Sequence, residues 1–295
     1  MNSKATTADG TLSIVDLATL AKPRITMMVL ITTLGGLVLA PGAPSLAIAA
    51  ALLAGTAMIV ASANALNMYL ERDVDTRMER TRDRPLPAGR MDPGVALAFG
   101  VVLALVSVPL LTFAVNPLTA MLAVIAHLSY VYVYTPLKQR TPAAVWVGAV
   151  PGAMGPLLGW AAATGSVGLG GLALFGVMFF WQVPHFHAIA TFRVDDYRNA
   201  GLKTLPGERG DAVTRRSIVL TLLVQIAVSL AITPLGVAGL PYLVAAAVLG
   251  AVYFGYAILG LRRAGAGTQW ARRLFFASLV YLPLLFAALV LDGRL

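Results

Sequence analysis

The chain has 295 residues, of which 58% are hydrophobic and only 12% are charged, and its mean hydropathy is +0.80. Soluble domains carry about 25% charged residues, so the composition excludes a soluble globular enzyme, a nucleic-acid-binding domain and a disordered chain, despite a net charge of +9. The sequence contains no cysteine, which excludes disulfides, zinc–thiolate sites, iron–sulfur clusters and thiol nucleophiles. We therefore expect an all-α polytopic membrane protein.

Residues 1–22 are expected to form a cytoplasmic tail, because they contain Lys4, Asp9 and Asp16 and lack the apolar core of a signal peptide. Residues 23–295 are expected to form a single transmembrane domain. A membrane-spanning helix needs about 20 mostly apolar residues. Apolar runs between charges predict nine such helices, at 25–41, 45–69, 94–114, 117–134, 143–163, 169–190, 217–236, 240–260 and 272–291.

The basic residues support this topology. Nine spans place the N-terminal tail and four loops on one side of the membrane, and these segments hold 21 of the 22 Lys and Arg residues. Only Arg294 falls on the other side. Because basic residues accumulate on the cytoplasmic side, we expect a cytoplasmic N-terminus, an external C-terminus and insertion in the inner (plasma) membrane.

The acidic residues gather in two of the cytoplasmic loops, which topology does not require. The loops after the second and the sixth predicted spans hold 10 of the 13 Asp and Glu residues. Each loop continues into a segment with a basic residue, proline and glycine, at 84–89 (RPLPAG) and 203–207 (KTLPG). Because the loops lie four spans apart, they indicate two four-helix pseudo-repeats followed by a ninth helix.

The first acidic loop carries a stripe of polar residues. Asn64, Asn67, Glu71 and Asp75 follow one another at steps of three, four and four, which places them on one face of a helix. Such a stripe is costly against lipid, so we expect it to face a cavity. Carboxylate oxygens are ligands that Mg²⁺ prefers. The candidate metal ligands are Asn67, Glu71 and Asp75, with Asp196 from the second loop.

Basic side chains alternate with these acids. Arginine beside a carboxylate-bound metal is a combination suited to a diphosphate, because guanidinium groups form bidentate hydrogen bonds with phosphate oxygens. The candidate diphosphate-binding residues are Arg72, Arg80, Arg84, Arg198 and Lys203. The alternative is a solvated, salt-bridged turn at a helix end, and for either loop taken alone both interpretations remain open.

Two segments resemble a known family. Asn67, Glu71 and Asp75 at four-residue spacing, followed by 80–87 (RTRDRPLP), resemble the first aspartate-rich motif of the UbiA superfamily of intramembrane prenyltransferases. The segments 181–186 (WQVPHF) and 196–206 (DYRNAGLKTLP) resemble the second motif region of the branch that prenylates heme. Glu71 stands where the superfamily usually has Asp, and the second loop lacks a clean Asp-x-x-x-Asp pair. The resemblance covers nearly the whole chain, including the nine-helix count.

The resemblance implies the transfer of farnesyl from farnesyl diphosphate to a vinyl group of heme b, giving heme O and diphosphate. It implies Mg²⁺ as cofactor and an active site at the cytoplasmic face. Farnesyl diphosphate, heme b and the lipid bilayer are the implied partners, with a downstream heme A synthase or terminal-oxidase assembly factors as further candidates and no nucleic acid. The residues to which it assigns catalysis are Asn67, Glu71, Asp75, Asp196 and Lys203.

The candidate heme-binding residues are Trp181, His185 and His187, near the cytoplasmic end of the sixth span. His185 is a candidate axial ligand, and the alternative is a histidine hydrogen-bonded at a helix end. Residues two apart on a helix do not share a face, so we do not expect His185 and His187 to bind one metal together. For His127, inside the fourth span, we expect a hydrogen bond between helices.

Two further patterns are given structural roles. Tyr130, Tyr132 and Tyr134 are expected to be aromatic residues at the membrane interface. Gly148, Gly152 and the two further glycines of the fifth span indicate a helix that packs closely against its neighbours.

Two alternative functions are kept. The first is another prenyltransferase of the same superfamily with a quinone-precursor or chlorophyll-type acceptor, against which the segment 181–186 argues. The second is a secondary transporter with two pseudo-repeats. Transporters place polar residues near the membrane midplane, whereas the acids here lie in cytoplasmic loops.

Overall fold

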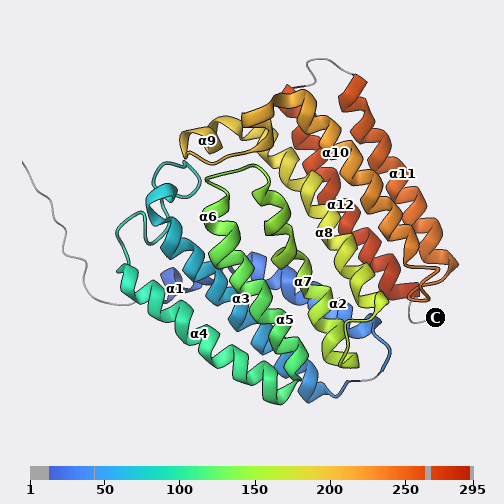
Figure 1. Ribbon diagram of the computed structural model, residues 1–295, viewed down its shortest axis with the longest axis horizontal. Helices are drawn as coiled ribbons and strands as arrows, with labels where there is room; N and C mark the ends of the chain where they lie inside the picture. Colours follow the sequence, from blue (N-terminus) through green and yellow to red (C-terminus); the bar gives the residue numbers. More distant parts are fainter. Residues whose placement is uncertain (1–12, 43, 263–266, 293–295) are drawn as a thin grey trace, which may run out of the picture.

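The computed structural model describes residues 13–42, 44–262 and 267–292, and throughout these ranges the regular secondary structure is helical (Figure 1). The expected all-α class is therefore confirmed. The elements are α1 (Ile14–Ala21), α2 (Pro23–Leu39), α3 (Leu46–Asp75), α4 (Pro93–Ala114), α5 (Pro117–Leu128), the π-helix η1 (Ser129–Tyr134), α6 (Thr135–Leu137), α7 (Ala144–Thr164), α8 (Leu169–Phe192), α9 (Val194–Asn199), α10 (Leu205–Ala231), α11 (Leu240–Arg262) and α12 (Gly267–Asp292).

Eight helical stretches of the described chain are long and apolar enough to cross a membrane. They are α3, α4, the continuous stretch Pro117–Leu137, α7, α8, α10, α11 and α12. The helix α2 is also apolar but has only 17 residues. The chain is thus an integral, multi-pass membrane protein.

Local sequence signals set several helix boundaries. The Asp92 side chain accepts a hydrogen bond from the backbone N–H of Gly94 (2.7 Å), and Pro93 occupies the first turn of α4. The Asn116 side chain accepts from the N–H of Thr119 (2.8 Å) at the start of α5. Such caps satisfy N–H groups that have no partner within the helix. The predicted boundaries at 94–114 and 117–134 agree to within three residues with α4 and with the continuous helical stretch Pro117–Leu137.

The predicted seventh span, 217–236, is displaced. The helix α10 begins at Leu205 and ends at Ala231. Hydropathy failed at its start because charged residues occupy the first turns, although Thr204 caps the helix through the N–H of Gly207 (3.3 Å). Gly210, with φ 75°, marks a kink that divides α10 into two helical segments. Charge therefore ended the apolar run but not the helix.

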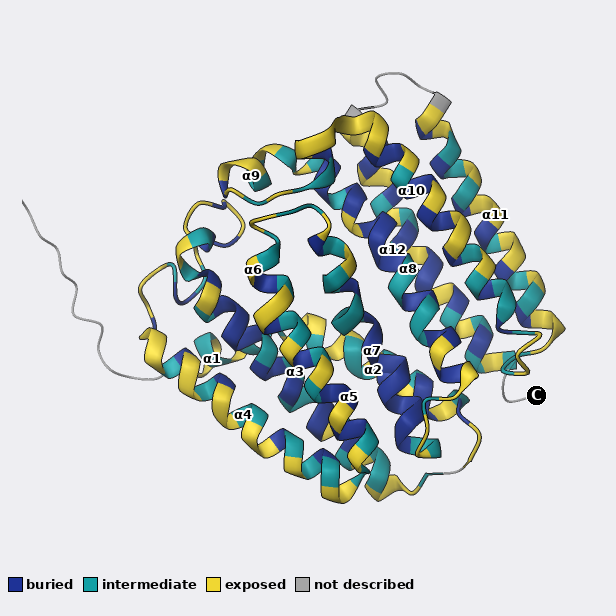
Figure 2. Ribbon diagram, viewed as in Figure 1, coloured by how far each residue is buried: buried dark blue, intermediate teal, exposed yellow. Residues whose placement is uncertain are grey.

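The described helices pack into three hydrophobic clusters, and the two larger ones meet on α7. One cluster joins residues of α8, α10, α11 and α12, including Leu174 and Leu222, and the other joins residues of α2, α3, α4 and α5, including Leu52 and Leu111. Trp160 of α7 belongs to the first cluster and Leu157 to the second. In Figure 2, α7 lies between the two groups of helices, with buried residues along it.

The helix α7 packs closely against α2, as its glycines predicted. A Cβ atom on Gly159 would lie 2.0 Å from the carbonyl oxygen of Thr33 and 2.4 Å from the amide nitrogen of Leu37. A Cβ on Gly36 would lie 2.0 Å from the carbonyl oxygen of Pro156. Glycine thus allows the two backbones to touch.

The segment expected as a tail contains α1, which packs against α3. Leu20 is fully buried, and Asn64 of α3 donates a hydrogen bond from Nδ2 to the carbonyl oxygen of Ala21 (3.3 Å). Asp16 forms an ion pair with Arg90 (3.2 Å). These contacts hold the start of the first apolar helix beside α3. Residues 1–12, with Lys4 and Asp9, lie outside the described residues, as do Arg263 and Arg294.

Candidate active site

The predicted polar stripe of α3 lines a pocket. Asn67, Glu71 and Asp75 are buried and border the same cavity of about 300 Å³. The prediction that they share a helix face is confirmed. Asn64, one turn earlier, borders a second, smaller pocket. Asp73 points away and is exposed, with a side chain 85% accessible.

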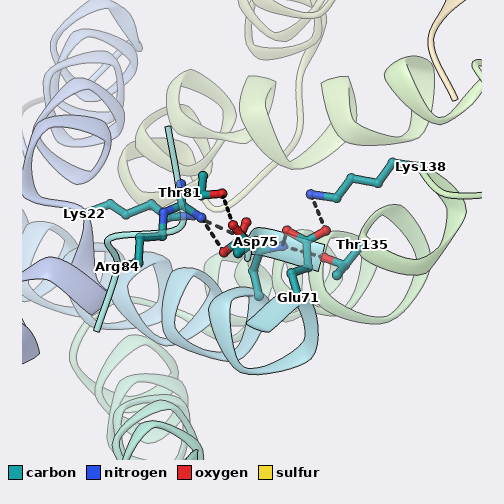
Figure 3. Close-up of polar contacts among 8 residues, drawn as sticks. Lys22, Glu71, Asp75, Thr81, Arg84, Thr135 and Lys138 are labelled. Carbon is teal, nitrogen blue, oxygen red and sulfur yellow. Dashed lines mark hydrogen bonds and ion pairs between the residues drawn. The ribbon is translucent and has the colours of Figure 1, made fainter. Parts of the chain in front are cut away.

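Each of the three side chains contacts a basic residue from another segment (Figure 3). Lys22 donates from Nζ to Asn67 Oδ1 (3.2 Å). Arg84 Nη1 lies 2.8 Å from Asp75 Oδ2. Lys138 forms an ion pair with Glu71. The pocket therefore joins α3 to the start of α2, to the loop after α3 and to the end of α6.

Further hydrogen bonds fix the stripe in place. Asn67 donates from Nδ2 to Glu71 Oε2 (2.9 Å) and to Thr135 Oγ1 (3.0 Å). Thr81 donates from Oγ1 to the carbonyl oxygen of Asp75 (2.8 Å), which folds the loop back over the helix end. Figure 3 shows Glu71 between Thr135 and Lys138, with Asp75 facing Arg84.

The pocket is electropositive. Its lining includes five basic residues but only the acids Glu71 and Asp75. Burial, together with the positive charges of Arg84 and Lys138, lowers the pKa of Lys22 to about 7. Burial also disfavours the charged form of Lys138, but the adjacent Glu71 carboxylate outweighs it and raises the pKa of Lys138. Excess positive charge in a partly buried site favours the binding of a multivalent anion.

The π-helix η1 turns two tyrosines into the pocket. Tyr130 and Tyr134 both border the cavity, whereas Tyr132 is 63% exposed. The Oγ1 of Thr135 donates to the carbonyl oxygen of Tyr130 (2.9 Å), a five-residue step that follows the wider turn. The expectation that all three tyrosines are interfacial was therefore wrong for Tyr130 and Tyr134. Single π-helical turns within α-helices are frequent at functional sites.

Three of the five predicted diphosphate-binding residues lie at the same pocket, and two lie elsewhere. Arg80 and Lys203 border the cavity beside Arg84. Arg72 instead donates to the carbonyl oxygen of Tyr69 (2.9 Å), outside the pocket lining. Arg198 is exposed and pairs with the neighbouring Asp195 (3.3 Å).

Asp196, predicted as a metal ligand, borders a separate polar pocket with Arg77 and Arg82. The two pockets share Met78 in their walls, so they are neighbours. The structure does not bring Asp196 into the lining of the pocket that holds Glu71 and Asp75.

The two histidines of α8 face different surroundings, as their spacing predicted. His185 Nδ1 lies 2.6 Å from Ser278 Oγ of α12, and its ring stacks on Trp181 with centroids 4.6 Å apart. The indole N–H of Trp181 donates to the carbonyl oxygen of Ser278 (3.1 Å). His187 is only 4% exposed and borders the cavity, and its Nε2 has no hydrogen-bond partner among the described residues.

A second, apolar pocket of about 110 Å³ adjoins the first and shares Ile25 and Tyr130 with it. Its lining is mostly aliphatic. At its edge, His127 Nε2 lies 2.9 Å from Ser62 Oγ, which confirms the expected hydrogen bond between helices. The two pockets together suit an amphiphile with an anionic head and an apolar chain.

Sequence reasoning missed four residues that complete the site. Lys22, Thr135 and Lys138 contact the polar stripe, and Tyr197 of α9 borders the cavity. One signal pointed to Lys22, because it directly precedes an apolar helix that starts with proline. The other three lie far along the chain in positions that no local spacing connects to Asn67.

The fold and the pocket define an integral membrane protein with a cationic binding site next to an apolar chamber. A model described as the UbiA prenyltransferase family matches residues 29–280. The chain belongs to this family and is a prenyltransferase.

Several relatives are named protoheme IX farnesyltransferase. The protein from Anaeromyxobacter dehalogenans is 51% identical over 277 residues, which cover 94% of this chain and 93% of the relative. The protein from Sorangium cellulosum is 55% identical over 250 residues, covering 85% and 89%.

Solved structures share the fold. A structure titled as digeranylgeranylglyceryl phosphate synthase has a TM-score of 0.82 and 16% identity, over 96% of this chain and 99% of that one. A UbiA homologue from Archaeoglobus fulgidus, solved with DMAPP and Mg²⁺, has a TM-score of 0.67 and 17% identity, over 93% and 99%.

Proposed function

We propose that this chain transfers the farnesyl group of farnesyl diphosphate to a vinyl group of heme b, producing heme O and diphosphate. The observation that carries the proposal is the 51% identity, over 94% of the chain, to a protein named protoheme IX farnesyltransferase. The cationic pocket and its apolar neighbour supply the two environments that a prenyl diphosphate needs.

Three basic residues of the pocket, Lys22, Arg84 and Lys138, bind the diphosphate of the donor. Lys22, Arg84 and Lys138 each approach a polar side chain of α3, so their charges converge on one part of the pocket. Charge-assisted hydrogen bonds to phosphate oxygens are strong and directional. The farnesyl chain then extends into the adjoining apolar pocket.

Asn67, Glu71 and Asp75 are the residues that would hold Mg²⁺. Mg²⁺ is usually bound by one or two carboxylates together with phosphate oxygens and waters, and the two buried carboxylates of this stripe fit that pattern. The described residues contain no group of three or more His, Asp or Glu side chains placed to bind a metal by themselves, so the diphosphate supplies part of the coordination. When bound, the ion neutralises negative charge on the leaving group. A contribution of Asp196 stays a prediction.

The reaction begins with cleavage of the bond between C1 of the farnesyl group and the ester oxygen of the α-phosphate. The electron pair leaves with the diphosphate, whose charge Lys22, Arg84 and Lys138 stabilise. The terminal carbon of the heme vinyl group bonds to the allylic cation, which leaves a cation on the vinyl carbon next to the porphyrin. Water adds there and loses a proton, giving the hydroxyl of heme O. The apolar lining keeps bulk water from the first cation.

The acceptor lies against α8 on the side that carries His187. This side chain and Phe186 border the cavity, whereas His185 and Trp181 point to α12. The prediction that His185 is an axial ligand therefore requires a change of its partner Ser278, and His187 is the better placed of the two. Contact of Trp181 with heme likewise stays a prediction.

The chain spans the membrane nine times, with α2 as the additional short span. Two four-helix halves precede α12, and the N-terminus and the pocket lie on the cytoplasmic side of the plasma membrane. The excess of basic residues in the corresponding loops supports this orientation.

Heme analysis tests the function directly. The chain is expressed in cells that lack heme O, and extracted hemes are separated and weighed by mass spectrometry. Appearance of the hydroxyethylfarnesyl heme is expected. Prenylation of 4-hydroxybenzoate in the absence of heme O would instead identify the quinone-type alternative, and movement of labelled substrate across vesicles without its consumption would identify a transporter.

A further inference from the structure

We propose that Arg80 and Lys203, at the mouth of the pocket, bind the carboxylates of the acceptor, so that the pocket has an inner cation group for the donor and an outer one for the acceptor. This inference rests on the proposed function. It replaces the sequence-based assignment of both residues to the diphosphate.

The five basic residues differ in depth. The side chains of Arg84 and Lys138 are 20% and 21% exposed. Lys203 is 44% exposed, and Arg80 also belongs to the exposed residues. All four border the same cavity. Depth therefore separates an inner group from an outer pair.

The two groups also differ in the acidic side chains that neutralise their positive charge. Lys138 and Arg84 face the buried carboxylates of Glu71 and Asp75. Arg80 forms no hydrogen bond or ion pair with any residue that the structure describes. Within the described part of the chain, the Lys203 side chain pairs with Glu208 alone (3.0 Å). The Glu208 side chain is itself 41% exposed, and such exposed pairs are weak. The outer pair thus keeps its charge available for a ligand.

The outer pair approaches the mouth from two sides. Arg80 belongs to the loop after α3, and Lys203 lies between α9 and α10. The backbone N–H of Lys203 donates to the carbonyl oxygen of Lys138 (2.9 Å), which holds this segment beside the inner group. Tyr197 of α9 borders the same cavity. Two anionic groups on one edge of a flat ligand would match these two cations, which come from different segments and border the same cavity.

Heme b has this shape. Its two propionates lie on the edge of the macrocycle opposite the vinyl groups. When a vinyl group reaches C1 of the donor beside the inner cations, the propionates point toward the mouth. The apolar residues Phe186 and Ile189 of α8 border the cavity and provide a wall for the macrocycle. The propionates then meet the outer cations while the vinyl group meets the donor, so the charge match fixes the orientation of the ligand in the pocket.

The test compares heme b with its dimethyl ester, in which both propionates are uncharged. Each is titrated into the purified full chain in detergent, and binding is followed by the Soret absorbance. We expect the wild type to bind heme b at least about tenfold more tightly than the diester, because hydrogen bonds between charged partners are worth about this factor or more. In Arg80→Gln and in Lys203→Gln this preference should fall several-fold, and in the double variant it should vanish.

A matched control and a donor measurement accompany these variants. Arg140→Gln removes an exposed cation of the neighbouring loop that does not border the cavity, and it should keep the wild-type preference. Binding of farnesyl thiodiphosphate, which ionises poorly, should stay within about twofold of wild type in Arg80→Gln and Lys203→Gln. That binding also shows that the variants are folded.

Three outcomes would overturn the inference. Equal binding of heme b and its diester by the wild type excludes a carboxylate site. A tenfold loss of donor-analogue binding with an unchanged preference for heme b assigns the outer pair to the diphosphate. Failure to bind or farnesylate either porphyrin, in a chain that still binds the donor analogue, removes the heme function and this inference with it.

Discussion

The contact between Glu71 and Lys138 illustrates how each motif residue is held before substrate arrives. Both partners are mostly buried, and one comes from α3 and the other from the end of α6. Removing one member of a buried pair leaves the other uncompensated, at a cost of about 3–5 kcal/mol when the pair is fully buried. This pair is partly accessible on the Lys138 side, so the cost is smaller.

We expect Glu71→Gln to abolish farnesyl transfer and to lower the free energy of unfolding by about 1–3 kcal/mol. The double variant Glu71→Gln with Lys138→Gln should recover most of that stability but not the activity, because neither the carboxylate nor the ammonium remains. Thermal unfolding in detergent and heme O formation are measured side by side. Recovery of activity in the double variant would contradict the assignment of these residues to substrate binding.

His185 and His187 provide a second comparison at this scale. His187→Ala should weaken heme b binding with little change in melting temperature, because its Nε2 makes no hydrogen bond within the described chain. His185→Ala should abolish heme O formation and also lower the melting temperature, since it breaks the contact with Ser278. The Ser278 hydroxyl still donates to the carbonyl oxygen of Phe275 (2.6 Å), so the loss is that of one hydrogen bond, about 0.5–1.5 kcal/mol.

Ser278→Ala is the control that separates the two roles of His185. If His185 acts through its packing against α12, Ser278→Ala should reproduce a large part of the loss of both stability and activity. An intact melting temperature with a changed Soret spectrum in His185→Ala alone would instead identify His185 as an iron ligand.

The residue scale also shows what the sequence could predict. Asn67, Glu71 and Asp75 were found because helical periodicity alone brings them together. Lys22, Thr135 and Lys138 were not, because they reach the same point only after α2 and α6 have packed beside α3. Local spacing carries no information about such contacts. The same limit applies to Asp196, which was predicted as a metal ligand and borders a neighbouring pocket.

At the scale of elements, the π-helix η1 determines which side chains of the fourth span enter the pocket. A π-helical turn contains one more residue than an α-helical turn, so it rotates everything that follows. Thr135 and Lys138 come directly after it and both contact the α3 stripe. The sequence of this segment is ordinary for a membrane interface, which is why periodicity did not reveal the turn.

Deleting Val133, whose side chain is exposed, should convert η1 into an α-helical turn and move Thr135 and Lys138 out of register. We expect farnesyl transfer to fall by more than about a hundredfold, because both contacts to α3 would be lost at once. Val133→Ala keeps the residue count and should retain activity. Equal activity of the two variants would show that the turn is not required.

The close contact of α2 and α7 gives a prediction about stability. Gly159→Ala would place a Cβ atom 2.0 Å from the carbonyl oxygen of Thr33, so the helices must separate, at a cost of about 1–3 kcal/mol. Gly255→Ala in α11 places its Cβ in open space and should be nearly neutral. Thermal unfolding of the two variants in the same detergent decides between them, and equal melting temperatures would argue against close packing.

At the scale of the whole molecule, hydropathy and charge predicted the helices well, because both are sums over many residues. The exceptions were α10 and α1. The start of α10 was missed because its first turns are charged, and α1 was assigned to the cytoplasmic tail of residues 1–22. Both are amphipathic or polar segments whose helical state depends on capping and on contacts with other helices.

The proposed topology can be tested with single cysteines, because the natural sequence has none. Gln139→Cys, between α6 and α7, should react with a membrane-impermeant thiol reagent only after the cells are opened. Ser166→Cys, between α7 and α8, should react in intact cells. Both positions are exposed, so accessibility within the protein does not bias the comparison. The reverse pattern would invert the orientation.

The position of α7 between the two larger hydrophobic clusters restricts how the molecule can move. Its Trp160 packs with one half of the helices and its Leu157 with the other, while its glycines lie against α2. Alternating access requires one bundle to rock against the other around a central site. Here α7 packs against both groups of helices, so a rocking motion would break its contacts with one of them. The architecture therefore disfavours transport by alternating access.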